Sequence, residues 1–247
     1  MNLYKMTSQE NTAKLTAYMQ KFLTQDEATT YMIIDGDRTL IPVDSTRHFF
    51  QLLQLDFNVL KSIFQEHGYS FEAFYKVATF YSTINSQTYQ NTCAKSAKSV
   101  SIYPEFLTFI DNLPQNVKCI VVTSGLREIW GNILQNHQLD NVSLIGGNYF
   151  PKDTFVIDPN AKKLIVNLLK NKGKNVSAFG DSLIDFEMLK EADRSFLIVN
   201  EKQNKDIIPF VSEIQQLQQI SFTEFEHKNI PKTKLTTILQ EILTAAT

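Results

Sequence analysis

The sequence predicts an α/β protein with a mainly parallel sheet, helices on both faces and an inserted all-helical segment. Two observations predict it. Short apolar runs alternate with helical patterns in residues 100–200, which is typical of parallel strands covered by helices. Apolar residues between Ser45 and about Ser99 recur instead at helical spacing, with no strand among them. The chain therefore combines a layered α/β core with a helical insert of about 55 residues.

The elements follow from these periodicities. An amphipathic helix is expected from Asn11 to Leu23, and the apolar run Met32–Ile34 ends in Asp-Gly, as a buried strand ending at a loop would. The insert has four helical patterns: STRHFFQLLQL, FNVLKSIFQEHG, SFEAFYKVATFYS and YQNTCAKSAK. The strands expected after it are 117–122, 142–145, 155–157, 176–179 and 196–199, and the helices are 104–113, 127–137, 161–172, 184–191 and 232–243.

Composition excludes several classes of protein. The 247 residues are 43% hydrophobic, which is enough for a substantial core. The net charge of -2 does not indicate binding to nucleic acid or to an anionic membrane. The N-terminal segment MNLYKMTSQENTAK lacks the apolar region of a signal peptide, and no stretch approaches a transmembrane helix. Cys93 and Cys119 have no metal-binding spacing and are interpreted as reduced thiols. We expect a cytoplasmic protein with no nucleic-acid or membrane partner; nothing in the sequence indicates an oligomeric state.

Polar residues follow the predicted strands. In parallel sheets ligands bind beyond the carboxyl ends of the strands, so these side chains are expected to share one crevice. They are Asp35 and Asp37 after the first strand, Thr123, Ser124 and Gly125 after VKCIVV, Asp181, Ser182 and Asp185 after VSAF, and Lys162 and Lys163 at the start of a helix.

Each of these residues also has a simpler interpretation. A lone Asp after a strand is usually a helix cap or a turn former, Thr ends many strands, and Lys162 and Lys163 suit a solvated helix start. Together, however, the carboxylates of Asp35, Asp37 and Asp181 would repel one another strongly without a hard cation such as Mg²⁺. The hydroxyl and free N–H groups near Thr123 suit a phosphate oxygen. The group predicts a metal and phosphate site.

Four short motifs resemble those of the haloacid dehalogenase (HAD) superfamily of phosphatases. Asp35-Gly-Asp37-Arg-Thr-Leu is similar to the DxDxT motif, IVVTSGL to the second motif, Lys162 to the third and GDSLID to the fourth. Order, spacing and preceding strands agree over residues 30–200. The resemblance implies a three-layer α/β/α Rossmann-like core of residues 1–41 and 100–247, and a helical type 1 cap domain of residues 42–99.

The resemblance also implies roles. Asp35 would be the nucleophile that forms an aspartyl-phosphate, and Asp37 the general acid and base. Asp35, the backbone carbonyl of Asp37, and Asp181 would hold Mg²⁺. Asp185 would act on the metal site indirectly, next to the ligands or through a water molecule. Thr123 and Lys162 would bind the phosphoryl oxygens; Ser124 and Lys163 are the alternatives at those two positions. The sequence assigns no role to Arg38.

The helical insert resembles the cap of the phosphoserine phosphatase branch. In that branch an acidic residue nine positions after the nucleophile meets the substrate amine, which here is Asp44; its alternative is an N-cap. Arg47 could bind a carboxylate or a second phosphate, or be a solvated charge. The insert's aromatic residues are expected to form mostly cap core, with one or two lining the substrate pocket: Phe49, Phe50, Phe71, Phe74, Tyr75, Phe80 and Tyr81.

The sequence thus predicts a Mg²⁺-dependent phosphatase, a phosphoric monoester hydrolase, whose substrate is a small phosphorylated metabolite resembling phosphoserine. Two alternatives remain: a phosphatase acting on a phosphoprotein or nucleotide, and a non-catalytic protein that binds a phosphorylated ligand on the same scaffold. The presence of every motif residue disfavours the second.

Overall fold

The core of the protein is a six-stranded parallel sheet with strand order β3-β2-β1-β4-β5-β6. The structure, a computed structural model, describes residues 6–24, 27–147, 155–200 and 203–245. The strands are β1 (Thr30–Asp35), β2 (Val117–Thr123), β3 (Ser143–Gly146), β4 (Asn175–Gly180), β5 (Arg194–Val199) and β6 (Leu217–Ser221). Because β1 pairs with both β2 and β4, its carboxyl end lies between theirs.

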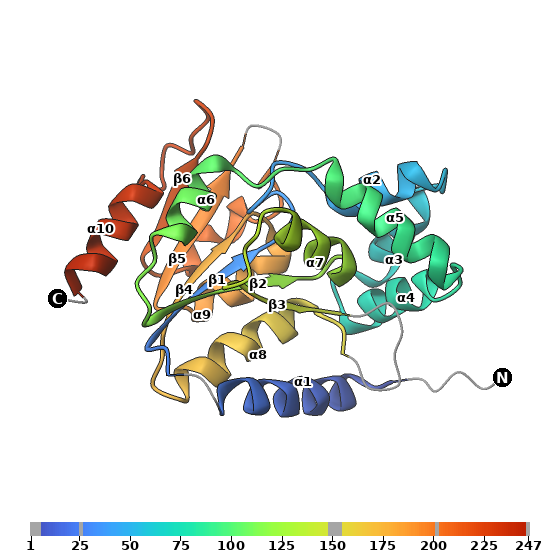
Figure 1. Cartoon of the computed structure of the whole chain (residues 1–247), viewed down its shortest axis with the longest axis horizontal. Helices are drawn as coiled ribbons and strands as arrows, with labels where there is room; N and C mark the ends of the chain where they lie inside the picture. Colours follow the sequence, from blue (N-terminus) through green and yellow to red (C-terminus); the bar gives the residue numbers. More distant parts are fainter. Residues whose placement is uncertain (1–5, 25–26, 148–154, 201–202, 246–247) are drawn as a thin grey trace.

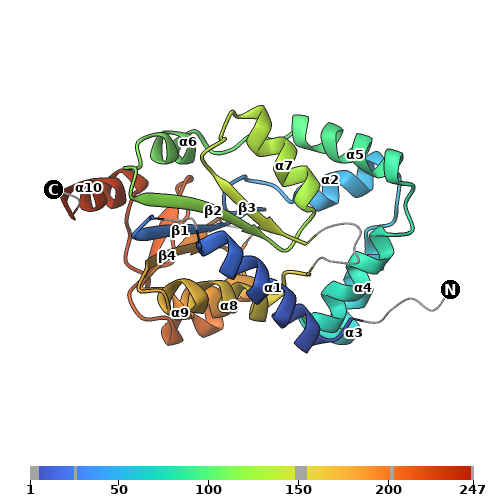
Figure 2. The ribbon, with the colours of Figure 1, turned by 60° about the horizontal axis from the view of Figure 1, so that its bottom comes forward.

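Helices cover both faces of this sheet, as Figures 1 and 2 show. One face is packed by α6 (Pro104–Asp111), α7 (Arg127–Asn136) and α10 (Leu235–Ala245), and the other by α1 (Ser8–Leu23), α8 (Pro159–Lys170) and α9 (Phe186–Glu191). Alternate residues of β1 serve the two cores: Met32 and Ile34 face the first, Tyr31 and Ile33 the second. A strand buried on both faces reads as a continuous apolar run, which explains the sequence of β1.

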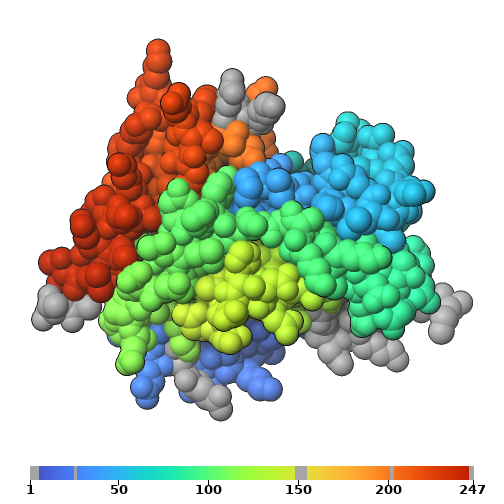
Figure 3. Space-filling model, turned by 45° about the horizontal axis from the view of Figure 1, so that its top comes forward, coloured from blue at the N-terminus to red at the C-terminus, as the bar shows by residue number. Residues whose placement is uncertain are grey.

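The helical insert, residues 45–98, leaves the sheet at the carboxyl end of β1. It consists of α2 (Ser45–Leu52), α3 (Asn58–His67), α4 (Phe71–Tyr81) and α5 (Ser86–Lys98), and α5 packs on α7 of the core. The insert forms a lobe at the opposite end of the molecule from α10 (Figure 3). The division into a cap of residues 42–99 and a core of residues 1–41 and 100–247 stays a prediction.

The sequence located most of these elements. The predicted three-layer α/β/α core and its parallel sheet are confirmed, as are the helices of the insert. The helix expected over residues 184–191 is split into a 3₁₀ turn, Leu183–Asp185, and α9.

The strand expected over residues 155–157 was wrong. Those residues are buried but form no strand, because the side chain of Asn11 takes the backbone hydrogen bonds that a strand would use. Its amide donates to the Val156 carbonyl at 3.1 Å, and its oxygen accepts from the Val156 N–H at 2.8 Å. The hydrogen bonds that would join this segment to a ladder are satisfied by one side chain instead.

Strand β6 and the 3₁₀ helix Ile208–Glu213 were not predicted. The sequence of β6, LQQIS, has too few apolar residues to indicate a strand. Gln219 is nevertheless buried, because its side-chain amide donates to the carbonyls of His227 and Ile230 at 2.7 and 2.5 Å. A polar residue is tolerated in a strand interior when its hydrogen bonds are met, and periodicity alone does not reveal that.

Helices able to cross a membrane are absent from the described residues: none is both long and apolar enough.

Candidate active site

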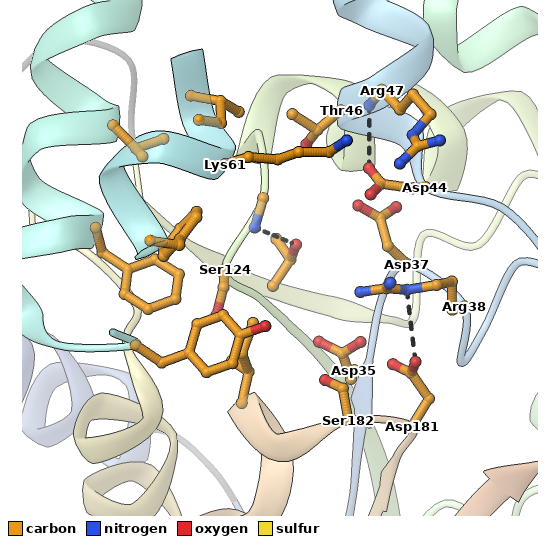
Figure 4. A pocket seen from close by; sticks show the side chains of 18 of the residues that line it. Asp35, Asp37, Arg38, Asp44, Thr46, Arg47, Lys61, Ser124, Asp181 and Ser182 are labelled. Carbon is orange, nitrogen blue, oxygen red and sulfur yellow. Dashed lines mark hydrogen bonds and ion pairs between the residues drawn. The ribbon is translucent and has the colours of Figure 1, made fainter. Parts of the chain in front are cut away.

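A cavity of about 590 Å³ lies between the carboxyl ends of β1, β2 and β4 and the helical insert. It is lined from the sheet side by Asp35, Asp37, Thr123, Lys162 and Asp181, all of which the sequence places after a strand or at a helix start. Figure 4 shows Asp35, Asp37 and Asp181 converging on it. The structure therefore brings the predicted residues of all four motifs into one place.

Lys162 joins two of the carboxylates. Its ammonium, fully buried, forms an ion pair with Asp35 and another with Asp185 at 2.6 Å. Burial alone lowers the pKa of Lys162, but the carboxylates of Asp185 and Asp35 outweigh it, so the pKa lies above its ordinary value. The lysine is therefore a fixed positive charge between two acids.

Asp35 is buried at the end of β1, with 8% of its surface exposed. The pKa of Asp35 is raised from 3.8 to about 6: burial and, less strongly, the neighbouring Asp185 raise it, and Lys162 opposes both. At pH 7 this carboxyl group is therefore mainly ionised.

Lys163, the alternative to Lys162, points elsewhere. Its ammonium pairs with Glu187 at 2.8 Å and Glu191 at 3.1 Å on the partly exposed surface of α9. Lys163 does not line the cavity.

Asp185 holds the loop after β4 together. One of its oxygens accepts hydrogen bonds from the backbone N–H groups of Asp181 and Ser182, at 3.1 and 3.2 Å, and from the Ser182 hydroxyl. Gly180 makes this possible, since a Cβ at that position would lie 2.5 Å from the Cβ of Asp185. With both oxygens engaged, Asp185 acts by positioning Lys162 and the backbone beside it.

Asp181 forms an ion pair with Arg38, and both side chains line the cavity. The Arg38 Nε lies 3.5 Å from a carboxylate oxygen of Asp181, and the Thr39 hydroxyl donates to the other oxygen at 3.5 Å. Burial raises the pKa of Asp181 and the guanidinium of Arg38 opposes that rise. Arg38 adopts a left-handed backbone conformation, with φ of 64°, which is uncommon for a residue other than glycine. The arginine to which the sequence assigned no role is thus the counter-ion of Asp181.

Asp37 is half-buried and points toward the insert. One of its oxygens accepts from the backbone N–H of Ser45 at 3.1 Å, which ties the first motif to the start of α2. Burial and the carboxylate of Asp44 raise its pKa to about 8. A carboxyl group with that pKa is mainly protonated at pH 7 and has a proton to donate.

Hydroxyl groups follow β2. The buried Thr123 hydroxyl oxygen accepts from the Gly125 N–H at 3.0 Å, and its own proton stays available. The Ser124 hydroxyl is buried without a hydrogen-bond partner and lines the cavity. Gly125 lies so close that a Cβ there would be 3.3 Å from both Asp37 and Thr123. Both serine and threonine therefore present donors, and the structure does not separate the two alternatives.

The residues present fit a divalent cation. Oxygen atoms of Asp35, Asp181 and Asp185 lie within 4.8 Å of one another, all buried. Carboxylate oxygens are the ligands that Mg²⁺ prefers. Because Asp185 is engaged by Lys162 and the backbone, Asp35 and Asp181 are the better ligands, and the side chain of Asp37 is not part of this group. We call Asp35, Lys162, Asp181 and Asp185 the polar floor.

On the insert side, Asp44 and Arg47 both line the cavity. Asp44 is the N-cap of α2 and accepts from the Arg47 backbone N–H at 3.0 Å. The Arg47 guanidinium lies over the ring of Phe57, 5.0 Å from its centroid. The N-cap alternative for Asp44 thus describes its observed contact.

Sequence reasoning missed most of the insert's contribution. Phe74 and Tyr81 line the cavity, as expected for one or two of the aromatic residues, whereas Phe49 and Phe50 are core. The residues missed are, from the insert, Thr46, Phe57, Leu60, Lys61, Phe64, Gln65, Gly68, Tyr69 and Val77, and, from the loop after β4, Ile184. Helical spacing of Phe57, Leu60 and Phe64 was the available signal, but the same spacing is typical of a buried face. We call Leu60, Phe64, Phe74, Val77 and Tyr81 the apolar wall.

Comparison with known proteins decides the family. The model of the haloacid dehalogenase-like hydrolase family matches residues 32–190, more than half of the chain. The protein belongs to this family. It is therefore a HAD-like hydrolase, as the four motifs predicted, and the match extends from β1 to the end of α9.

Solved structures share the fold of this HAD-like hydrolase. A substrate-bound phosphoserine phosphatase is 16% identical, with a TM-score of 0.56, over 88% of this chain and 100% of that chain. A HAD family hydrolase from Salmonella enterica serovar Typhi is 16% identical, with a TM-score of 0.55, over 87% and 79%. Cytosolic 5'-nucleotidase IIIB bound to cytidine is 11% identical, with a TM-score of 0.52, over 95% and 93%. At these identities the likeness establishes the fold alone. No curated protein sequence matches significantly.

Proposed function

We propose that the protein is a Mg²⁺-dependent phosphatase that hydrolyses a small phosphomonoester through an aspartyl-phosphate. The observation that supports this most is the arrangement of Asp35: an ionised carboxylate at a strand end, held by the ammonium of Lys162 and facing an open cavity. Phosphoryl transfer needs a positioned nucleophile and fixed positive charge around the phosphoryl oxygens.

The residues would act in sequence. An oxygen of Asp35 attacks phosphorus, the bond from phosphorus to the leaving oxygen breaks, and protonated Asp37 gives its proton to that oxygen. Asp37, now a carboxylate, takes a proton from water, whose oxygen attacks the aspartyl-phosphate; phosphate leaves and Asp35 is restored. Lys162 and the hydroxyls of Thr123 or Ser124 hold the phosphoryl oxygens.

Asp35, Asp181 and the backbone carbonyl of Asp37 would hold the Mg²⁺. When bound, the cation neutralises negative charge on the phosphoryl oxygens and between Asp35 and Asp181. Asp185 would keep Lys162 and the loop after β4 in place. In this proposal residues 42–99, which include the helical insert, form the cap that covers the site and contacts the leaving group.

The test is hydrolysis of p-nitrophenyl phosphate. The wild-type protein should hydrolyse it with Mg²⁺ and lose the activity in EDTA, and Asp35→Asn should lower kcat by at least about 10³-fold. Asp140→Asn, which neutralises an exposed aspartate outside the cavity, is the matched control and should keep full activity. Equal rates for wild type and Asp35→Asn would refute the proposal.

The intermediate has its own readout. Acid-quenched wild-type protein incubated with a ³²P-labelled substrate should retain label that hydroxylamine releases, and Asp35→Asn should retain none. Label that persists in the variant would assign the nucleophile elsewhere.

A further inference from the structure

The apolar wall is the feature of the cavity that the reaction does not use. Its five side chains come from α3 and α4, opposite the strand ends, and four of them are nearly buried: Leu60, Phe74, Val77 and Tyr81 expose 4%, 6%, 8% and 5% of their surface. Phe64 is half-buried and packs edge-on against Phe74, with ring centroids 5.1 Å apart. The lining that these five residues contribute is apolar except for the Tyr81 hydroxyl.

Two polar groups on the insert side, Asp44 and Arg47, already have a contact within the protein. Recognition of an amino-acid leaving group needs an acid for the amine and a cation for the carboxylate. Asp44 instead caps α2, and Arg47 lies over Phe57. Lys61 reaches into the cavity beside Thr46, where Figure 4 shows its ammonium, and it is the cation most available there.

The size of the cavity points the same way. At about 590 Å³ it lies within the roughly 300–1,000 Å³ of pockets that enclose drug-sized ligands, which are larger than phosphoserine. A phosphorylated serine bound by the polar floor would leave the part of the apolar wall that faces the cavity uncovered. A ring attached to the leaving oxygen would cover it and remove both surfaces from water, which is favourable in proportion to the apolar area.

We propose that the substrate is the phosphomonoester of a ring-bearing, largely apolar alcohol, with the phosphoryl group on the polar floor and the ring against the apolar wall. This inference rests on the proposed phosphatase activity, and it replaces the phosphoserine-like substrate by a class that this chain's own insert fits.

The test compares three phosphomonoesters of alkyl alcohols in the presence of Mg²⁺. Ethyl phosphate and 2-phenylethyl phosphate have leaving groups of similar intrinsic reactivity and differ by the ring; phosphoserine adds the charges of an amino acid. We expect kcat/KM for 2-phenylethyl phosphate to exceed that for ethyl phosphate on the order of 100-fold, from the apolar area of one ring. We expect phosphoserine to resemble ethyl phosphate.

Variants of the wall connect that preference to the structure. Phe64→Ser should reduce the ratio of the two kcat/KM values by about tenfold, and Val77→Thr, nearly the same in shape, should reduce it by a smaller factor. Val59→Ser is the matched control: Val59 is also on α3, is 40% exposed and does not line the cavity, so the ratio should stay at the wild-type value.

Two results would overturn the inference: phosphoserine turned over faster than 2-phenylethyl phosphate, or a ratio that neither Phe64→Ser nor Val77→Thr changes. Acetyl phosphate separates this failure from failure of the phosphatase proposal, because it has no ring and is chemically activated. If Asp35-dependent hydrolysis of acetyl phosphate persists, only the substrate class is wrong. If acetyl phosphate is also untouched, the phosphatase proposal and the inference fall together.

Discussion

The polar floor and the apolar wall face each other across one cavity and are built on opposite principles. In the floor each charge has a fixed partner: Lys162 lies between Asp35 and Asp185, and Arg38 faces Asp181. The wall has no ion pair among its five residues and is held by packing of rings and aliphatic groups. The stability of the floor therefore depends on the identity of each charged group, whereas the stability of the wall depends on the shape and area of its apolar side chains. Chemistry common to a family belongs to the first kind of surface, and choice of substrate to the second.

The largest effect should come from removing the central charge of the floor. Lys162→Met leaves Asp35 and Asp185 buried, close together and without their ammonium, so the free energy of unfolding of the metal-free protein should fall by about 3–5 kcal/mol. Denaturant unfolding followed by circular dichroism measures this.

Lys163→Met is the matched control, one position along the same helix. Its pairs with Glu187 and Glu191 are partly exposed, so we expect a change of about 1 kcal/mol or less. Equal losses for the two variants would mean that burial of the lysine does not distinguish them.

A smaller effect should follow from removing the carboxyl group of Asp37, which we propose as the proton donor. Asp37→Asn should lower kcat for an alkyl phosphate by about 10²-fold, and much less for p-nitrophenyl phosphate, whose leaving group needs no proton. Steady-state rates on the two substrates check this. Equal losses on both would argue against an acid role for Asp37.

The same variant should change how stability depends on pH. In the metal-free protein Asp37 keeps its proton up to a pKa of about 8, whereas the unfolded chain releases it near 3.8. Unfolding between these values releases a proton, so this group stabilises the fold most fully at low pH and that contribution is lost as pH rises toward 8. Asp37→Asn should flatten this decline in thermal unfolding measured in EDTA; an unchanged slope would contradict it.

The smallest effect on stability should come from changing Asp44, at the start of α2, where the insert leaves the core. Asp44→Ala removes the N-cap of α2 and should cost about 1 kcal/mol, while Asp44→Asn keeps the cap and should cost little. Both variants remove the carboxylate that raises the pKa of Asp37, so the limb of the pH–rate profile that reports Asp37 should move to lower pH. If only the alanine variant moved it, the cap rather than the charge would set that pKa.

The floor was predictable from sequence to a degree that the wall was not. Asp35, Thr123, Lys162 and Asp181 each stand at the end of a strand or start of a helix, and parallel topology brings such positions together. Reactive residue types at those places are few, so the sequence could name them. Only the contacts show that Lys162 rather than Lys163 enters the cavity.

The wall was hidden because apolar side chains at helical spacing look alike whether they face a core or a cavity. Leu60 and Val77 have the periodicity of buried helix faces, and they are nearly buried. What distinguishes them is that they also line the cavity, which depends on how α3 and α4 are placed relative to the strand ends. The sequence assigned no role to Arg38 because its partner, Asp181, is 143 positions away in the chain.

The ion pair between Lys162 and Asp35 joins residues 127 positions apart. During synthesis Asp35, Asp37 and the whole insert leave the ribosome long before this lysine does. Until α8 and β4 join the sheet, Asp35 has neither the ammonium nor Asp181 beside it, and closing so long a loop is slow and entropically costly. The first half of the chain thus contains Asp35 before its partner Lys162 has been made. The site would therefore be completed late and in a single step, when β4 pairs with β1 at the centre of the sheet.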